Sequence, residues 1–253
     1  MPITVKSERE IELMTQAGQI LEKVHDELAK ELHAGMTTKD VDRLGEELIR
    51  SYGCIPSFLD YNGYPASICV SVNDEVVHGI PSEHRFLRDG DIVSLDAGVI
   101  YKGYHSDAAR TYGIGEISQE AKDLIRVTRE CFFEGISTRK RAIIYLTSRG
   151  PIGRYATERG YGVVRDLCGH GIGTAMHEAP EIPNYEQNRK GVLLKAGMTL
   201  AIEPMINIGG WEVDWMDDDW TVVTRDHSLS AHYENTILIT TGEPKILSYT
   251  GEQ

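Results

Sequence analysis

The sequence contains little cysteine and no apolar run long enough to cross a membrane. Its four cysteines lie far apart and include no C-x-x-C pair, which excludes a disulfide framework and a zinc knuckle. No stretch approaches the ~20 apolar residues of a transmembrane helix. The opening residues MPITVKSEREIEL lack the basic-then-apolar pattern of a secretory signal. These absences predict a protein of the reducing cytoplasm with no membrane partner.

Basic residues are scarce relative to acidic ones. The 253 residues include 26 Lys and Arg against 39 Asp and Glu, which gives a net charge of −13. Phosphate backbones require a basic surface, so nucleic acid is not expected as the main partner. Proline-rich linkers and low-complexity segments are also absent. We therefore expect a single domain over residues 1–253.

The sequence contains the same order of predicted helices and strands twice. Ser7 and Glu10 match a capping box before apolar residues at helical spacing, and Thr37 opens a second helix. Segments rich in β-branched residues follow. The order then repeats, with helices near residues 119–136 and 152–159 and strands to the end. This pattern predicts an α+β fold of two similar halves rather than a βαβ alternation.

Two aspartates lie inside a predicted β-hairpin. If Lys102 and Gly103 form its two-residue turn, the pairing register places Asp96 and Asp107 on the same face. Their Cβ atoms would then be diagonal neighbours, roughly 7–8 Å apart. Two inward carboxylates repel each other unless a cation lies between them. The pair therefore indicates a cation site.

Three further segments place ionisable residues beside apolar strands. The segment CGHGIG contains His170, MTLAIEPMI contains Glu203, and SAHYENTILIT contains Glu234. Buried acids are rare without partners. With the two aspartates they make four carboxylates and one imidazole, a set that suits Mn²⁺, Fe²⁺ or Co²⁺ better than a thiolate zinc site does.

Eight motifs occur in order along the chain: HGIP, SLDAGV, GYHSDAART, GHGIG, MHEAP, AIEPM, DDWTVVT and YENT. With them the sequence closely resembles type I methionine aminopeptidases over nearly its whole length. The resemblance implies the pita-bread fold, two pseudo-twofold-related helix-helix-sheet halves around a central metal site, in a single catalytic metallopeptidase domain. It also implies removal of the initiator methionine from nascent proteins whose second residue is small.

The same resemblance assigns the ligands. Asp96 would hold one metal ion, Asp107 and Glu234 would bridge two, and His170 and Glu203 would complete the second ion's shell. The expected cofactors are two divalent ions, Co²⁺, Mn²⁺ or Fe²⁺, with the native metal left open. Two such ions sharing one water can activate it as the nucleophile and polarise the scissile carbonyl.

Further residues match catalytic positions of the family. Glu203 would also carry the proton from the attacking hydroxide to the leaving amine. His177, in MHEAP, would contact the substrate and steady the tetrahedral intermediate, and His78, in VVHGIP, would lie near the scissile amide nitrogen. His84 and His227 lack such a context, so we expect both at the surface.

The methionine side chain needs an apolar pocket with aromatic walls to meet its sulfur. The residues matching the family pocket are Phe58, Tyr61, Cys69, Met176 and Trp220, with Tyr64 nearby. Some relatives have a small thiol at the position of Phe58, and an aromatic ring there narrows the rim. The acidic run WEVDWMDDDWTV is expected to form a solvated loop beside the pocket.

One segment, Ser137–Pro151, departs from the family pattern. The family has a Gly-Asn turn followed by an amphipathic helix, which Gly150 and Pro151 would interrupt. Residues 141–151 can be back-translated so that a reading two bases later encodes GNHLSDISRA, close to the family segment. A compensated pair of frame errors is one hypothesis, and a genuine variant is the other.

Two alternatives remain beside the leading interpretation. A proline-specific peptidase of the same fold uses the same ligand types but usually carries an additional N-terminal domain, for which this chain has no room. A non-catalytic pita-bread binding module would have lost ligands, and all five are present here. Without an N-terminal zinc-binding extension or a late helical insertion, the sequence resembles the short bacterial form. The expected partners are nascent chains with N-terminal Met, with transient proximity to the ribosome, and we expect a monomer.

Overall fold

The computed structural model describes residues 3–137, 150–186, 191–249 and 251. Two helices open the chain, α1 (Glu8–Glu31) and α2 (Thr38–Ser51). Both begin with a complete capping box, Ser7 with Glu10 and Thr37 with Asp40, as the sequence predicts. No helix among these residues is both long and apolar enough to span a bilayer.

The first half of the fold is a four-stranded antiparallel sheet. Its strands are β1 (Ile55–Pro56), β2 (Ile68–Val72), β4 (Ile92–Tyr101) and β5 (Tyr104–Gly113). Strand β4 pairs with all three others. The β4–β5 turn at Lys102 and Gly103 has positive φ at both residues, 49° and 87°, as a two-residue primed turn requires. The predicted hairpin register is confirmed, with Asp96 opposite Ala109 and Asp107 opposite Gly98.

The second half repeats the order of two helices and a sheet. Helix α3 spans Gln119–Ser137 and α4 spans Pro151–Thr157. The sheet has the order β15-β14-β9-β7-β8. Its strands are β7 (Gly169–Gly171), β8 (Glu178–Ile182), β9 (Thr199–Ile202), β14 (Asn235–Leu238) and β15 (Lys245–Ile246). The predicted duplication of helix-helix-sheet units is therefore confirmed.

Two three-stranded sheets complete the fold, with the orders β13-β10-β6 and β11-β12-β3. Their strands are β3 (Glu75–Val77), β6 (Gly162–Val163), β10 (Met205–Asn207), β11 (Val213–Trp215), β12 (Val222–Thr224) and β13 (Ser230–His232). A short 3₁₀ turn, η1 (Tyr61–Gly63), precedes β2.

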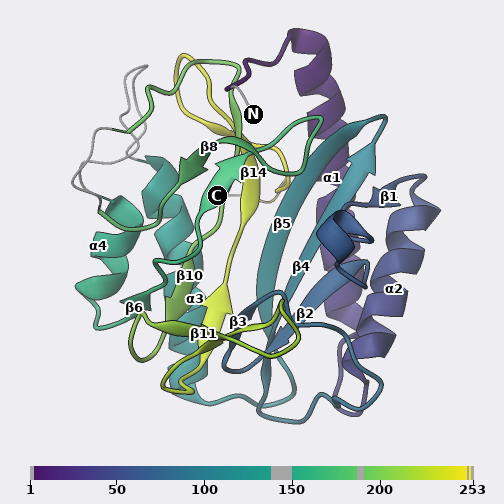
Figure 1. Ribbon diagram of the computed structural model, residues 1–253, viewed down its shortest axis with the longest axis vertical. Helices are drawn as coiled ribbons and strands as arrows, with labels where there is room; N and C mark the ends of the chain where they lie inside the picture. The colour runs from purple at the N-terminus through teal and green to yellow at the C-terminus, as the bar shows by residue number, and fades with distance from the viewer. Residues whose placement is uncertain (1–2, 138–149, 187–190, 250, 252–253) are drawn as a thin grey trace.

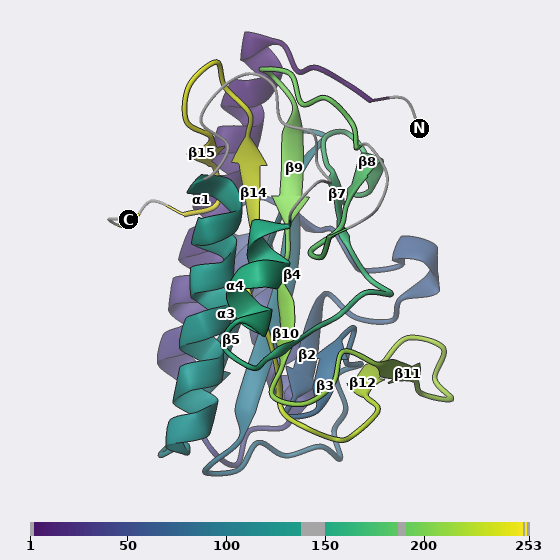
Figure 2. The same cartoon turned by 90° about the vertical axis from the view of Figure 1, so that its left-hand side faces the viewer.

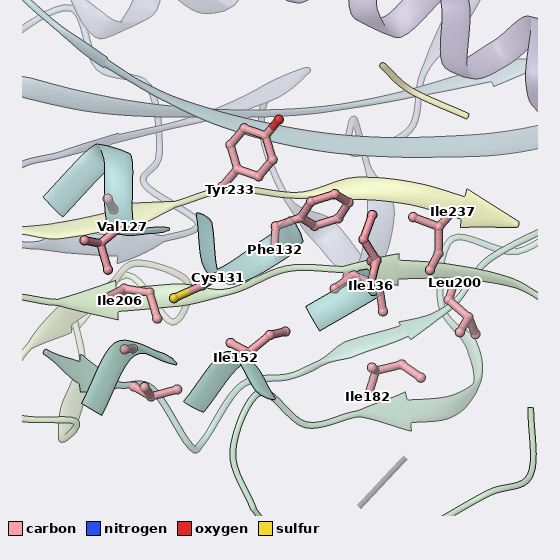
Figure 3. Close-up of a cluster of buried hydrophobic side chains, with 14 of the residues drawn as sticks. Val127, Cys131, Phe132, Ile136, Ile152, Ile182, Leu200, Ile206, Tyr233 and Ile237 are labelled. Atoms are coloured by element: carbon pink, nitrogen blue, oxygen red, sulfur yellow. The ribbon is translucent and has the colours of Figure 1, made fainter. Parts of the chain in front are cut away.

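The helices lie together on one side of the sheets, with α1 and α2 beside the β4–β5 hairpin and α3 and α4 beside the second half (Figures 1 and 2). Figure 3 shows the core under α3, where Phe132 lies close to Tyr233 of the segment between β13 and β14. Their ring centroids are 5.4 Å apart in an edge-to-face arrangement. Because this core occupies the helical side, the other side of the sheets is left for the site.

The segment that departs from the family pattern lies mostly outside the described residues, which exclude 138–149. At its end, Gly150 caps α4 and Pro151 occupies the first helical turn. Proline is well tolerated there because the first amide groups of a helix have no intrahelical partner. Gly150 and Pro151 therefore begin a helix in this protein. The frame-error hypothesis stays a prediction.

Candidate metal centre and substrate pocket

Asp96 and Asp107 enter the site from the middle of the β4–β5 hairpin. Both side chains are buried, with relative exposures of 9% and 3%. Burial, followed by repulsion from Asp107, raises the pKa of Asp96 well above its usual value. Burial also raises the pKa of Asp107 to about 8. Two carboxylates in this position are costly without a cation, as the sequence predicts.

Glu234 comes from the second half and lies directly against the hairpin. Its backbone exchanges two hydrogen bonds with Ala109, its N–H donating at 3.0 Å and its carbonyl accepting at 3.3 Å. Beside this pair, the Thr236 hydroxyl accepts from the Asp107 N–H at 2.8 Å and donates to the Asp107 carbonyl at 3.0 Å. These contacts hold β5 and β14 together at the point where the two carboxylates face each other.

His170 and Glu203 approach from neighbouring segments of the second sheet. The His170 Nδ1 lies 2.8 Å from the Gly171 carbonyl and donates to it, which leaves Nε2 with its lone pair toward the carboxylates. Nε2 is 3.7 Å from Asp107 Oδ2 and 3.6 Å from Glu203 Oε1. Burial lowers the pKa of His170 to about 4, so the ring is neutral and able to bind a metal at neutral pH.

The ligand atoms form two overlapping groups. In one, atoms of Asp107, His170 and Glu234 all lie within 4.8 Å of one another, and in the other so do atoms of Asp96, His232 and Glu234. Three buried carboxylate oxygens, Asp96 Oδ1, Asp107 Oδ1 and Glu234 Oε1, have no hydrogen-bond partner among the described residues. Such atoms need a ligand, because buried polar atoms without partners are rare. The residues therefore fit a site for divalent cations with oxygen and imidazole ligands.

Two further histidines border the metal ligands. The His177 Nδ1 lies 2.8 Å from the Tyr61 hydroxyl, and the two rings are stacked with centroids 5.4 Å apart. His78 has a positive φ of 59°, an uncommon backbone conformation for a residue with a side chain. Burial, followed by repulsion from His177, lowers the pKa of His78 to about 4. Burial also lowers the pKa of His177 to about 4, so both imidazoles are neutral at neutral pH.

One cavity of about 410 Å³ is lined by all of these residues except His232. Its lining residues are Phe58, Tyr61, Asn62, Tyr64, Cys69, His78, Asp96, Asp107, His170, Met176, His177, Glu203, Trp220 and Glu234. Every residue expected in the metal site or the methionine pocket is in this set. Tyr64 packs edge-to-face against Trp220 at 5.1 Å, and Tyr64 donates to the Gly79 carbonyl at 2.9 Å. The aromatic walls are thus fixed by packing and by a hydrogen bond.

The two histidines that were predicted to lie at the surface, and the acidic residues of the acidic run, do not line the cavity. His84 is exposed, and His227 is 76% exposed and paired with Asp74. The acidic run is exposed from Asp214 to Asp219, but Val213–Trp215 at its start form strand β11 rather than a loop. These positions match the predicted surface histidines, and the solvated loop is the part of the acidic run that lies between β11 and β12.

Sequence reasoning missed two residues of the site, Asn62 and His232. Asn62 lies in the η1 turn, which has no periodic pattern that would orient it toward the cavity. His232 does carry a signal, because it precedes Glu234 by two positions and side chains two apart in extended chain point the same way. The structure therefore places a further imidazole near Asp96 and Glu234 that the sequence analysis did not single out.

Comparisons with known proteins agree with this geometry. The model of metallopeptidase family M24 matches residues 12–241. The methionine aminopeptidase of Clostridium acetobutylicum is 53% identical over 249 residues, which cover 97% of this chain and 98% of the relative. The crystal structure of methionine aminopeptidase from Thermotoga maritima superposes with a TM-score of 0.94 at 43% identity, covering 98% of this chain and 100% of the other.

A more distant match is the Xaa-Pro dipeptidase of Bacillus anthracis. It superposes with a TM-score of 0.79 at 25% identity. The match covers 98% of this chain but 63% of the dipeptidase. The shared part is therefore the fold around the site.

Proposed function

This chain belongs to metallopeptidase family M24 and is a methionine aminopeptidase of type I with the pita-bread fold, and from this premise we propose a role for each residue of the site. The proposed reaction is hydrolysis of the peptide bond after the initiator methionine of new proteins whose second residue is small. We further propose that residues 1–253 act as a single catalytic domain in the cytoplasm.

Five side chains would hold two divalent ions. Asp96 would bind one ion, Asp107 and Glu234 would bridge both, and His170 and Glu203 would bind the other. Glu234 belongs to both ligand groups, while Asp96 and His170 belong to different ones, which supports a bridging role for Glu234 and separate ions for Asp96 and His170. When bound, such ions supply Lewis acidity that polarises a carbonyl and lowers the pKa of a water molecule. Co²⁺, Mn²⁺ and Fe²⁺ all suit the ligand set, and availability decides among them.

Glu203 would move the proton of the reaction. Its carboxylate lines the cavity beside His170, and burial raises its pKa well above the usual value, so it can take up a proton during the reaction. Its backbone carbonyl accepts from the Asn184 side chain at 2.9 Å, which fixes the segment that carries it.

His177 and His78 would bind the reacting peptide. The Tyr61 contact orients the His177 ring, so that the other ring nitrogen can donate to the oxygen that gains charge in the tetrahedral intermediate. His78 packs against Trp220, with ring centroids 6.3 Å apart, and would contact the scissile amide nitrogen.

The methionine side chain would occupy the apolar part of the cavity. Phe58, Tyr64, Cys69 and Met176 are buried there, and the aromatic rings offer edges that suit a thioether sulfur. The observation that supports the proposal is that one cavity is lined both by the proposed metal ligands and by this apolar pocket.

The test is release of Met from Met-Ala-Ser by metal-free protein to which Co²⁺, Mn²⁺, Fe²⁺ or Zn²⁺ is added back. We expect activity that depends on metal and falls by at least about 100-fold in His170→Ala. X-Pro peptides serve as the competing substrate, and faster cleavage of those would favour a proline-specific peptidase. No release with any metal, from folded protein, would favour a binding module.

The proposed partners are nascent polypeptides that begin with Met. The enzyme would contact these chains only transiently near the ribosome. A protein of net charge −13 offers little basic surface for tight docking on nucleic acid. We expect the enzyme to act as a monomer, with no membrane or nucleic acid as partner.

A further inference from the structure

His232 is a buried histidine that the proposed mechanism does not use. It ends β13 and is 2% exposed. Neither of its ring nitrogens has a hydrogen-bond partner among the described residues. A buried imidazole in this condition is unfavourable unless something binds it. By contrast, the buried His25 in α1 bonds the Ala108 carbonyl at 2.8 Å.

The surroundings of His232 are those of a metal ligand. Its Nε2 lies 3.6 Å from Glu234 Oε2, and its ligand atom falls within 4.8 Å of those of Asp96 and Glu234. A separation of 3.6 Å is too long for a hydrogen bond. Two donors that each lie about 2.0–2.2 Å from one ion are separated by roughly 3.0–3.6 Å. The distance therefore suits two ligands of the same ion.

His170 provides an internal comparison. Its Nε2 stands 3.6 Å from Glu203 Oε1 and 3.7 Å from Asp107 Oδ2, the oxygens with which it would share an ion. His232 stands at the same distance from Glu234. The two imidazoles are thus at similar distances from the carboxylates that they face.

We propose that His232 is a sixth ligand, which gives an imidazole nitrogen to the divalent ion held by Asp96 and Glu234. Each of the two ions then has one imidazole, His232 in one group and His170 in the other. This inference rests on the proposed two-ion site. A second nitrogen donor favours Co²⁺, Fe²⁺ and Zn²⁺ over Mn²⁺, because affinity for imidazole rises along that series of ions.

The experiment uses the full chain loaded with Co²⁺. Coordinated imidazoles give solvent-exchangeable N–H proton resonances that the paramagnetic ion shifts far from the diamagnetic range. We expect two such resonances in the unsubstituted protein. His232→Gln should remove one and His170→Ala the other.

Calorimetric titration with Co²⁺ gives a second readout. We expect His232→Gln to weaken one of the two sites by at least about tenfold while the other changes less than twofold. The matched control is His25→Gln, which replaces an equally buried histidine that belongs to neither ligand group and should leave both affinities unchanged.

The possible results distinguish failure of the proposed His232 ligand from failure of the two-ion site itself. Two bound Co²⁺ ions with a single shifted imidazole resonance, unchanged by His232→Gln, would overturn the role of His232 and leave the proposed function standing. Failure of the unsubstituted protein to bind Co²⁺ would overturn the two-ion site itself. If His232→Gln does not fold, the number of resonances in the unsubstituted protein decides the question.

Discussion

Asp96, Asp107 and Glu234 share one property at the scale of single residues: each is a buried carboxylate with one oxygen that has no hydrogen-bond partner among the described residues. Burial raises the pKa of all three, and their mutual repulsion raises those of Asp96 and Glu234 further. A bound divalent cation offsets this unfavourable free energy, because it attracts the carboxylates that otherwise repel one another. Binding of a metal ion therefore stabilises the cavity, because it removes the repulsion between these buried carboxylates.

Phe58 is expected to decide how closely the pocket fits methionine. It lies against Gly98, where a Cβ atom would come within 2.9 Å of the Phe58 ring. We expect Phe58→Cys to lower kcat/KM for Met-Ala-Ser about tenfold, mainly through KM, because the substrate loses apolar contact. Steady-state kinetics with Met-Ala-Ser and Phe-Ala-Ser measure the effect. Unchanged KM would remove Phe58 from the pocket, and Phe86→Cys, at an exposed position, is the control.

Lys6 and Glu178 form a buried ion pair beside His177. Nζ and Oε2 are 2.6 Å apart, and the side chains are 5% and 4% exposed. Lys6→Met leaves the Glu178 carboxylate buried without its cation, so we expect a loss of about 3–5 kcal/mol in the free energy of unfolding at pH 7. Urea unfolding measures it. Arg43→Met, which breaks an exposed pair with Glu83, should cost less than about 1 kcal/mol.

The same pair gives a pH dependence with a definite sign. Burial by itself would raise the pKa of Glu178, but hydrogen bonds from Lys6 and Thr4 outweigh it and hold that pKa below its usual value. The stabilisation is complete above the unfolded pKa of about 4.3 and is lost as the pH falls through the lower folded value. The difference between the unsubstituted protein and Lys6→Met should therefore shrink below pH 4. A difference that stays constant would contradict this account.

At the scale of elements, the contact between β5 and β14 brings the two sets of ligands together. Arg110 of β5 reaches across this contact. Its guanidinium donates to the Glu234 carbonyl and to Asn235 Oδ1, the latter at 2.6 Å, and lies 4.4 Å from the centroid of the Tyr233 ring. One side chain thus fixes the segment Tyr233–Asn235 against the hairpin.

Arg110→Met should loosen this contact while it keeps the side-chain volume. We expect metal affinity to fall about 10–100-fold, because supports of metal ligands have effects of this size. We also expect the free energy of unfolding to fall by about 2–4 kcal/mol as carbonyls lose their donors. Calorimetric Co²⁺ titration and urea unfolding measure the two effects. Arg225→Met, which loses an exposed pair with Asp214, is the control, and an equal change there would refute the role of Arg110.

At the scale of the whole molecule, the site lies where two halves of like order meet. Helices α1 and α2 support the hairpin and α3 and α4 support the second sheet, all on one side (Figures 1 and 2). Each half contributes carboxylates that repel those of the other. The metal-free molecule therefore carries repulsion across the contact that joins its halves.

Metal removal is expected to make stability fall with rising pH. Burial raises the pKa of Asp107 to about 8, so between the unfolded value and pH 8 the folded state holds more protons than the unfolded state. Stability therefore decreases as the pH rises through that window. The buried histidines act in the opposite sense only below about pH 6.5. We expect metal-free protein to lose at least about 1 kcal/mol between pH 6.5 and 8.5 by urea unfolding.

Metal should restore that loss, by about 2.7 kcal/mol at a free concentration of 100 times Kd. Glu234→Gln, which removes one repelling carboxylate, is the control and should flatten the pH dependence. Equal stability of metal-free protein at both pH values would show that burial does not hold the pKa of Asp107 above its usual value.

The sequence by itself determined the local parts of this protein. Capping residues set where α1 and α2 begin, and the turn at Lys102 and Gly103 set the register that puts Asp96 and Asp107 on one face. Such features depend on neighbours in the chain or on one turn, so they can be read from a short stretch of residues. The family motifs added the remaining ligands and the pocket residues.

Only the tertiary structure decided how these parts converge. Asp107 and Thr236 are 129 positions apart, yet their hydrogen bonds place Glu234 beside the hairpin. The Tyr61–His177 contact and the position of His232 follow from the same packing. No local pattern specifies such contacts, because they depend on burial of apolar surface between elements far apart in the chain. His232 shows the difference: its spacing from Glu234 was visible in the sequence, but its unpartnered nitrogens were not.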